Sequence, residues 1–295
     1  MTLTKDPARL GFRSCQSETE ALEALAEFGE DARTLAGGTD LMIQYQRGEV
    51  KPVLLVHIRR IALLRGIKVD GPMTIGAVTT HRQLATDELV RRHFPALAEA
   101  AATVGGWQTQ EAGTVGGNLC NGSPAADTVP PLLVADAIVH LASSRERRSM
   151  TLDKFLLERR RTARQPDELV TGIELAPAPP HTGEVYLKVG PRRAMEVALV
   201  GLAVRLTFGE DSATVTDARI AACSVGPRPF RAAEAEAVLV GSRLEAAAVA
   251  EAGQLLTRTA QPIDDVRATA SYRLRVLAPL LGRAVEACLV RAGGR

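Results

Sequence analysis

The sequence predicts an α+β protein made of two or three compact units, and three observations support this prediction. The chain has 295 residues, 46% of them hydrophobic, which is enough to bury a substantial core and is long for a single unit. Residues 17–58 have the pattern of a helix, a short strand, a Gly-Gly turn, a second helix and a buried strand. After the proline-rich run 176–180, strands come first and helices follow, which is typical of a separate α+β unit.

The first half of the chain carries clear signals for helices and strands. Ser17 and Glu20 form a capping-box pattern and Gly29 supplies a stop, so a helix is expected between them. Pro95 is expected to kink or split the helical stretch 88–104, because proline removes a backbone hydrogen bond. Strands are also expected at 34–36, 53–58, 73–77, 137–142 and 170–175. One further helix is expected at 39–47, with Thr39 near its N-cap, and another is expected to start near residue 79.

The second half is expected to begin after the Ala-Pro-Ala-Pro-Pro run at 176–180, where we place a domain boundary. Alternating or continuous apolar runs predict three strands, and longer apolar stripes at helical spacing predict three helices. The strands are expected near 185–189, 200–206 and 218–223, and the helices near 231–240, 245–259 and 271–291.

The composition argues against several classes of protein. Lysine and arginine number 36 against 34 acidic residues, so the net charge of +2 provides no field that favours nucleic acid or an anionic membrane. No segment approaches the roughly 20 apolar residues of a membrane span, and we expect a soluble protein of the cytoplasm. The four cysteines stand 65 or more residues apart, so this chain is not expected to build a metal cluster from a local motif.

The first candidate site is the segment Leu35-Ala-Gly-Gly-Thr-Asp-Leu41. Two glycines between a strand and a helix let the backbone amides turn toward one point, and the helix N-terminus adds partial positive charge. A phosphate would be stabilised there without a lysine. The alternative is a purely structural corner, in which Asp40 only favours the first helical turn.

The second candidate site is Gly113-Thr-Val-Gly-Gly-Asn-Leu-Cys-Asn-Gly-Ser-Pro-Ala-Ala-Asp127. It lies in the stretch 105–127, whose six glycines break the regular pattern and leave few positions that anchor a core. Such a stretch is either a mobile surface loop or a ligand cradle. Its paired glycines and its polar side chains, from Asn118 to Asp127, favour the cradle.

The sequence lacks several well-known catalytic patterns. Neither candidate site has the Gly-x-x-x-x-Gly-Lys-Ser/Thr pattern or a complete Gly-x-Gly-x-x-Gly, and the chain has no Gly-x-Ser-x-Gly elbow. No acid/base pair stands out. We therefore expect a bound cofactor to carry the reaction.

Three motifs in order resemble those of the FAD-binding medium subunits of molybdenum hydroxylases, the family of xanthine dehydrogenase and carbon monoxide dehydrogenase. They are Ala36-Gly-Gly-Thr-Asp-Leu41, Thr74-Ile-Gly-Ala77 with Thr79-Thr80, and the segment 113–127. The stretch Lys188-Val-Gly-Pro-Arg-Arg-Ala-Met195 is similar to the start of the family's C-terminal domain. The resemblance implies a vanillyl-alcohol-oxidase-type (PCMH-type) FAD fold in two subdomains, at 1–58 and 59–178, and a C-terminal α+β domain at 179–295 with a small antiparallel sheet and helices.

The resemblance also implies which residues hold FAD. Residues 36–40 would wrap the pyrophosphate, and residues 114–118 would form a second wall along it. Asp127 would bond hydroxyl groups of the cofactor, Lys188 would reach the flavin end, and Val104 would lie beside the flavin ring. The complete expected set is Leu35, Ala36, Gly37, Gly38, Thr39, Asp40, Leu41, Gly76, Ala77, Thr79, Val104, Gly113, Thr114, Val115, Gly116, Gly117, Asn118, Ser123, Asp127, Leu169, Val170 and Lys188.

Some residues depart from the family pattern or allow two interpretations. The stretch 107–112 lacks an arginine often found before the second glycine-rich segment, and Gly190-Pro191 replaces a small polar and basic pair. Trp107 is either a core anchor or a neighbour of the flavin. Arg159, Arg160, Arg161 and Arg164 are expected to form a solvated loop, with a partner-docking patch as the alternative.

The resemblance implies an electron-transfer role in a larger assembly. A large partner subunit would carry the molybdenum–pterin cofactor, and a small one would carry two 2Fe–2S clusters that pass electrons to FAD on this chain. An external acceptor, either NAD, a quinone, a cytochrome or oxygen, would then receive them, and the heterotrimer would occur in one copy or two. The first alternative is a self-contained FAD-dependent oxidoreductase of the same fold, and the second is a scaffold without cofactor.

Overall fold

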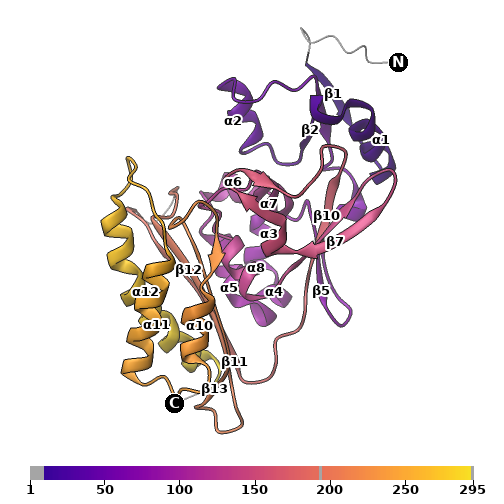
Figure 1. Cartoon of the computed structure of the whole chain (residues 1–295). Coiled ribbons are helices and arrows are strands. Elements are labelled where there is room, and N and C mark those ends of the chain that lie inside the picture. Colours follow the sequence, from indigo (N-terminus) through magenta and orange to yellow (C-terminus); the bar gives the residue numbers. More distant parts are fainter. Residues whose placement is uncertain (1–9, 193–194, 294–295) are drawn as a thin grey trace.

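The computed structural model describes residues 10–192 and 195–293, and three larger sheets and one two-stranded sheet organise these residues (Figure 1). The expected segment 188–195 includes residues 193–194, which lie outside the described ranges. Within those ranges no helix has the length and apolar character that crossing a bilayer requires. The mixture of helices and sheets in these residues confirms the predicted α+β class.

The first region contains a small parallel sheet in the order β1-β3-β2, with β3 between its two neighbours. Its helix α1 begins after Ser17, whose hydroxyl accepts the Glu20 amide, and ends at Gly29 with φ +51°, as the sequence predicted. The elements are β1 (Gly11–Ser14), α1 (Glu18–Phe28), η1 (Gly29–Asp31), β2 (Ala32–Leu35), α2 (Leu41–Gln46) and β3 (Leu54–His57).

The middle region has an antiparallel sheet in the order β4-β5-β10-β6-β7, with helices packed against it. Strand β10 comes last in the sequence yet pairs with both β5 and β6, so the region closes on itself. Its elements are η2 (Ala62–Leu64), β4 (Ile67–Val69), β5 (Met73–Gly76), α3 (His81–Thr86), α4 (Glu88–His93), α5 (Pro95–Ala102), α6 (Trp107–Ala112), α7 (Val115–Asn121), α8 (Val129–Val134), β6 (Ile138–Ala142), β7 (Arg147–Thr151), α9 (Leu152–Phe155), β8 (Leu156–Glu158), β9 (Arg161–Thr162) and β10 (Leu169–Leu175).

Two expectations about the middle region have clear outcomes. Pro95 does split the helical stretch: α4 ends at His93 and α5 starts at Pro95, where the missing amide costs nothing. The stretch 105–127 is not an irregular loop, because it contains α6 and α7. Val115 and Leu119 are completely buried and anchor α7, so tertiary packing outweighs the low helix propensity of its glycines.

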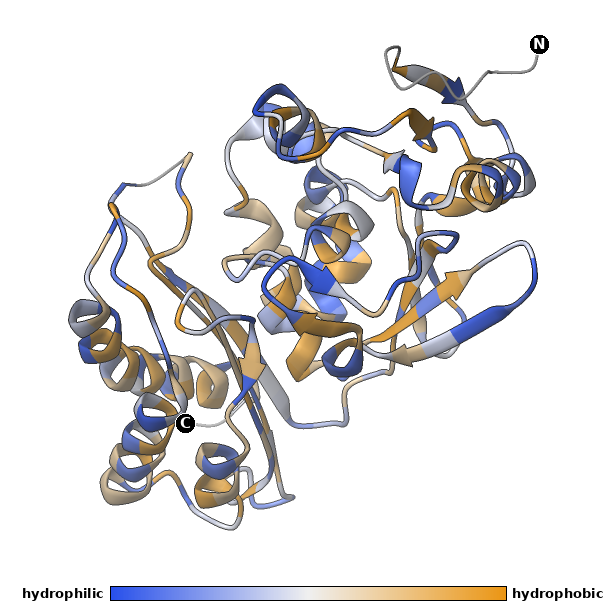
Figure 2. Ribbon diagram, turned by 45° about the horizontal axis from the view of Figure 1, so that its top comes forward, coloured by the Kyte–Doolittle hydropathy of each residue, from blue (hydrophilic) through white to orange (hydrophobic). Residues whose placement is uncertain are grey.

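The C-terminal region is an antiparallel sheet, β11-β12-β13-β14, with three helices on one face (Figure 1). Hydrophobic stripes run beside polar ones along these helices (Figure 2), and the apolar residues enter a core shared with the sheet. The elements are β11 (Thr182–Val189), β12 (Val200–Phe208), β13 (Val215–Cys223), β14 (Phe230–Arg231), α10 (Ala233–Leu239), α11 (Ala246–Thr259) and α12 (Ala270–Arg291).

The other face of the C-terminal sheet packs against the middle region. Helix α5 contacts β11, and helix α8 contacts β12 and β13. Tyr186, Ala203 and Ala221 of these strands belong to the core of the middle region rather than to the C-terminal core. Because β12 is buried along its whole length between two layers, the two regions form a continuous packed structure.

Six of the described strands were not predicted from the sequence: β1, β4, β7, β8, β9 and β14. Strand β1 has four residues and β4 has three, too few for an alternating pattern to stand out. Strand β7, with the sequence Arg-Arg-Ser-Met-Thr, lies at the edge of its sheet and carries no buried apolar face. Pairing with β6 fixes its conformation, and local propensity does not.

Candidate functional site

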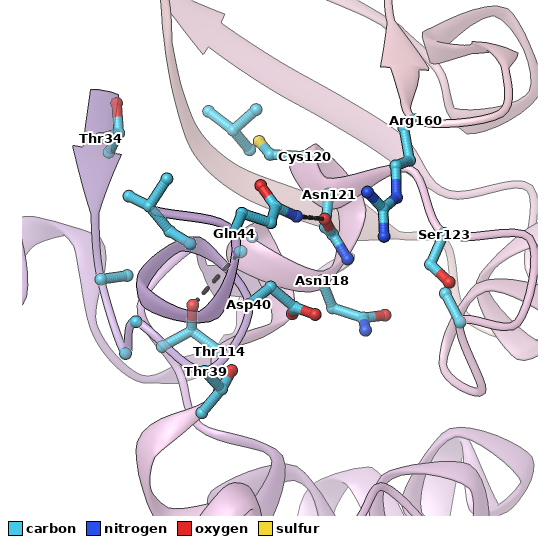
Figure 3. A pocket seen from close by; sticks show the side chains of 18 of the residues that line it. Thr34, Thr39, Asp40, Gln44, Thr114, Asn118, Cys120, Asn121, Ser123 and Arg160 are labelled. Atoms are coloured by element: carbon cyan, nitrogen blue, oxygen red, sulfur yellow. Dashed lines mark hydrogen bonds between the residues drawn. The ribbon is translucent and has the colours of Figure 1, made fainter. Parts of the chain in front are cut away.

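All three regions contribute to one large cavity of about 960 Å³. This volume is near the top of the range of about 300–1,000 Å³ that is usual for ligand pockets. The first region supplies the turn 36–41, the middle region supplies α7 and the segment 123–127, and the C-terminal region supplies residues 195–197. Figure 3 shows side chains from the first two of these regions facing one another across it.

The first wall of the cavity is the turn between β2 and α2. Gly38 has φ +72°, a left-handed conformation that glycine adopts without strain. No hydrogen bond within the described residues uses the backbone amides of residues 37–40, although all four residues line the cavity. Helix α2 begins at Leu41 with Asp40 rather than the expected Thr39 as N-cap, and the Asp40 side chain caps no amide. The wall therefore offers donors to a bound group.

The second wall is helix α7, and its amides are used differently. Thr114 caps the helix by accepting the Gly117 amide at 3.2 Å. The Val115 amide donates to the Thr79 carbonyl at 3.0 Å, and the Gly116 amide donates to the Ala77 carbonyl at 2.9 Å. A Cβ atom at Gly116 would lie 2.7 Å from the Ala77 Cβ and carbonyl oxygen. This glycine thus allows two protein segments to touch, and its amide is not available to a ligand.

Polar side chains cover the cavity side of α7. Gln44 from α2 donates to Asn121 Oδ1 at 2.9 Å, which joins the first region to α7 (Figure 3). Thr128 donates to Asn118 Oδ1 at 2.7 Å and fixes the orientation of that amide. Asn118 and Ser123 line the cavity beside them. The second wall therefore presents side-chain donors and acceptors where the first presents backbone amides.

The far end of the cavity is held by a buried ion pair between Lys188 and Asp127, whose side chains are 5% and 7% exposed. Lys188 Nζ donates to Asp127 Oδ2 at 2.9 Å, to the Thr103 carbonyl at 2.9 Å and to the Glu196 carbonyl at 3.2 Å. Tyr186 donates to Asp127 Oδ1 at 2.6 Å. An ammonium group has three donors, and here all three are used.

Lys188 consequently acts on the cavity through its neighbours. Asp127 and Glu196, which Lys188 bonds, line this end of the cavity. Val104, which follows the bonded residue Thr103, lines it as well. Burial raises the pKa of Asp127, although Lys188 and Tyr186 oppose that shift. Lys188 thereby forms a clamp that ties α5, the segment after α7 and the C-terminal region together, and its expected contact with the flavin end stays a prediction.

Two buried polar atoms at the cavity have no hydrogen-bond partner within the described part of the chain: Thr34 Oγ1 and His81 Nδ1. His81 is 2% exposed, and burial lowers its pKa to about 4, so the ring is neutral. An unpaired buried polar atom is costly, by about 1–3 kcal/mol. Both atoms favour a site that is completed by a bound group.

The structure brings most of the expected site residues together. Those that line the cavity are Ala36, Gly37, Gly38, Thr39, Asp40, Leu41, Ala77, Val104, Thr114, Gly116, Gly117, Asn118, Ser123, Asp127, Leu169 and Val170. Those that do not line it are Leu35, Gly76, Thr79, Gly113, Val115 and Lys188. The second group lies directly behind the lining: Thr79 accepts the Val115 amide, and the Gly113 carbonyl accepts the amide of His81.

Sequence analysis missed several lining residues. His81 and Gln44 carried no recognisable signal, because each is an isolated residue that only the tertiary fold places at the cavity. The arginine-rich run did carry a signal, and Arg159, Arg160 and Arg161 are exposed, in line with the expected solvated loop. Arg160, Arg161 and Arg164 line the cavity, whereas Arg159 does not.

Trp107 is not a core anchor, since it is 64% exposed. Its ring lies under the Arg82 guanidinium, 3.9 Å from the ring centroid, a cation–π contact. It begins α6 and does not line the cavity. The structure thus removes the first of the two interpretations of this residue.

Comparison with known proteins identifies the class. A family model described as "FAD binding domain in molybdopterin dehydrogenase" matches residues 9–178, and one described as "CO dehydrogenase flavoprotein C-terminal domain" matches residues 185–288. The chain belongs to this family of FAD-binding subunits, and it is an oxidoreductase component with FAD as its cofactor.

Relatives extend the comparison over almost the whole chain. The xanthine dehydrogenase FAD-binding subunit of Escherichia coli O157:H7 is 30% identical over 94% of both chains. The carbon monoxide dehydrogenase medium chain of Hydrogenophaga pseudoflava is 30% identical over 97% of this chain and 99% of its own length. A solved structure of carbon monoxide dehydrogenase from the same organism superposes with a TM-score of 0.92, at 30% identity over 96% of this chain and 98% of that one.

The cavity suits FAD on physical grounds. The cofactor is long, carries two phosphates in its centre and has many polar groups along its length. The unused amides of residues 37–40 fit the negative charge of a diphosphate, and the side chains on α7 fit hydroxyl groups. When bound, FAD supplies the redox chemistry, and the chain supplies binding and orientation.

Proposed function

We propose that this chain is the electron-transferring FAD subunit of a multi-subunit molybdenum hydroxylase. In this role FAD receives electrons from 2Fe–2S clusters on a small partner subunit and delivers them to an external acceptor, and a large partner subunit carries the molybdenum–pterin cofactor and the substrate site. The observation that carries the proposal is a single cavity, walled by both glycine-bearing segments, in which the amides of residues 37–40 are unused.

We assign the parts of the cavity as follows. The turn 36–41 holds the diphosphate with its backbone amides, and Thr114, Asn118 and Ser123 bond the polar groups beside it. Ala77, Leu169 and Val170 provide apolar walls. Leu35, Gly76, Thr79, Gly113 and Val115 support these walls from behind. At the far end Lys188 bonds Asp127 and the carbonyl of Thr103, the residue before Val104.

The proposal includes a division of the chain into units of 1–58, 59–178 and 179–295. The two family models, at 9–178 and 185–288, and the separate sheets of the described residues support it. Names of relatives support the assembly: one is a medium chain, and another is subunit alpha of a 6-hydroxypseudooxynicotine dehydrogenase complex from Paenarthrobacter nicotinovorans. We place the assembly in the cytoplasm, as one or two heterotrimers, because the four free cysteines fit a reducing compartment.

Native purification tests the proposal in one sample. We expect the chain to co-purify with two other polypeptides, with about one FAD per copy, and with molybdenum and iron. The separated chain should keep FAD and lack turnover with organic substrates. A yellow chain that purifies alone and oxidises an organic substrate would instead establish a self-contained oxidoreductase, and a colourless chain without FAD affinity would indicate a scaffold.

A further inference from the structure

The arginine-rich run 159–164 forms a hairpin that reaches the cavity from the middle region. Strands β8 and β9 pair around the turn at residues 159–160. Arg160 has φ +57°, a conformation that is uncommon outside glycine, and its amide donates to the Gly122 carbonyl at 2.8 Å just after α7. The backbone of Gly122 is so close that a Cβ atom there would lie 3.1 Å from Arg160 Cα. The hairpin tip is therefore fixed against the wall of the cavity.

The Arg160 side chain extends into the cavity toward Asn121 (Figure 3). Its NH1 group donates to Glu49 Oε2 at 2.9 Å, so it bridges from the middle region to the first. This is the only hydrogen bond of the Arg160 side chain within the described residues, although a guanidinium has five N–H donors. The remaining donors are available to a ligand.

The neighbouring arginines are placed differently. Arg164 NH1 donates to the carbonyls of Gln165 and Glu168, which fixes its own loop. Arg161 also lines the cavity, but within the described residues its side chain makes only a long contact of 3.8 Å with Glu158 on its own hairpin, and it is 69% exposed against 51% for Arg160. Arg159 lies outside the cavity lining. Arg160 is thus the arginine of this run that a bond to the first region holds across the cavity while most of its donors stay unused.

Electrostatics near the diphosphate wall need a positive group. Asp40 belongs to that wall, and desolvation by burial raises the pKa of its carboxyl, while the charge of Arg160 lowers it. Arg160 is therefore close enough to Asp40 to interact with it. A diphosphate at the turn 36–41 would meet the Asp40 carboxylate, and a nearby guanidinium would offset that repulsion.

We propose that Arg160 is a phosphate-binding residue of this chain, which spans the cavity and bonds the diphosphate of the dinucleotide opposite the amides of the turn 36–41. The inference rests on the proposed function, because it needs FAD in this cavity. A guanidinium matches the geometry of phosphate oxygens, so a lysine should replace it only in part.

The test measures FAD affinity of the flavin-free chain by the quenching of FAD fluorescence. Arg160→Gln should weaken binding by roughly 10- to 100-fold, the usual worth of a hydrogen bond to a charged group. Arg160→Lys should fall between Arg160→Gln and the wild type. Arg159→Gln, the matched control one residue away, should bind FAD within about threefold of the wild type. Higher salt should weaken wild-type binding more than that of Arg160→Gln.

A second variant separates direct binding from a purely structural bridge. Glu49→Gln removes the partner of Arg160 and leaves the guanidinium, so it should bind FAD at least as tightly as the wild type. If Glu49→Gln weakens binding as much as Arg160→Gln, the bridge is structural and the proposal is overturned. It is also overturned if Arg160→Gln binds FAD like Arg159→Gln. A wild-type chain that takes up no FAD would overturn the proposed function as well. Thermal unfolding of each flavin-free variant shows whether it is folded.

Discussion

The two glycine-bearing walls of the cavity look alike in sequence and differ in their physics. In the turn 36–41 the backbone amides are unused, and Gly38 adopts a left-handed conformation. In helix α7 the first amides are bonded to Thr79, Ala77 and Thr114, and Gly116 permits close packing. A pair of glycines in a sequence therefore indicates a position that needs space or an unusual φ. It does not by itself indicate whether a bound ligand contacts the backbone there.

The comparison leads to a general expectation. Substitutions in α7, or in the residues that pack behind it, should act mainly on the stability of the flavin-free chain. The first backbone amides of α7 are already bonded to protein groups. Changes in the turn 36–41 should act mainly on FAD affinity, except at Gly37, where a Cβ atom would lie 1.8 Å from the Ala112 carbonyl oxygen. Each of the following substitutions tests one side of this contrast.

The largest effect is expected from Lys188→Met, which removes the buried lysine that supports the cavity from behind. It leaves Asp127 buried without its cationic partner, and breaking a buried pair typically costs about 3–5 kcal/mol. Urea unfolding of the flavin-free chain measures the loss. The double variant Asp127→Asn with Lys188→Met should recover part of it, since the unpaired charge is gone. A loss below about 1 kcal/mol would show that the clamp contributes little.

A smaller effect is expected from acid, through His81, which begins α3 beside Gly113. The folded-state pKa of His81, about 4, lies below the unfolded value of about 6.5. The unfolded chain therefore binds the proton more readily, and the stability present above pH 6.5 is lost as the pH falls toward 4. Linkage gives a loss of roughly 3 kcal/mol over that window.

The variant His81→Gln isolates this effect, because glutamine does not titrate. Its free energy of unfolding should depend less on pH between 6.5 and 4 than that of the wild type. Parallel curves for the two proteins would rule out His81 as the source. Because the shift arises from burial alone, bound FAD is not required for the measurement.

The smallest changes in stability are expected from a matched pair of glycine substitutions. Gly116→Ala places a Cβ atom 2.7 Å from Ala77 and should cost about 1–3 kcal/mol of stability by overpacking. Gly38→Ala, at φ +72°, should cost about 1–2 kcal/mol, and its Cβ meets only the side chains of Met42 and Leu35.

The two variants should differ more in FAD binding than in stability. Gly38→Ala changes the turn whose amides are unused, so its FAD affinity should fall more than that of folded Gly116→Ala. Titration of both flavin-free variants with FAD checks the order. The reverse order would mean that α7, and not the turn, provides the dominant contacts.

Much of the fold was predictable from local signals. The cap at Ser17, the stop at Gly29 and the break at Pro95 each act within a few residues, and the structure has all three. The short strands β1 and β4 and the polar edge strand β7 were not predictable, because pairing with distant strands defines them. Helix α7 was missed because buried contacts compensate for its glycines.

The sequence by itself determined the two glycine-bearing segments and the longer helices and strands of the fold, since these follow from backbone preferences and periodicity. Only the tertiary structure decided which donors remain for a ligand. Gln44 meets Asn121, Glu49 meets Arg160, and Asp127 meets Lys188 across large sequence separations. A hydrogen-bond donor is available or consumed according to its neighbours in space, and no local pattern records those neighbours.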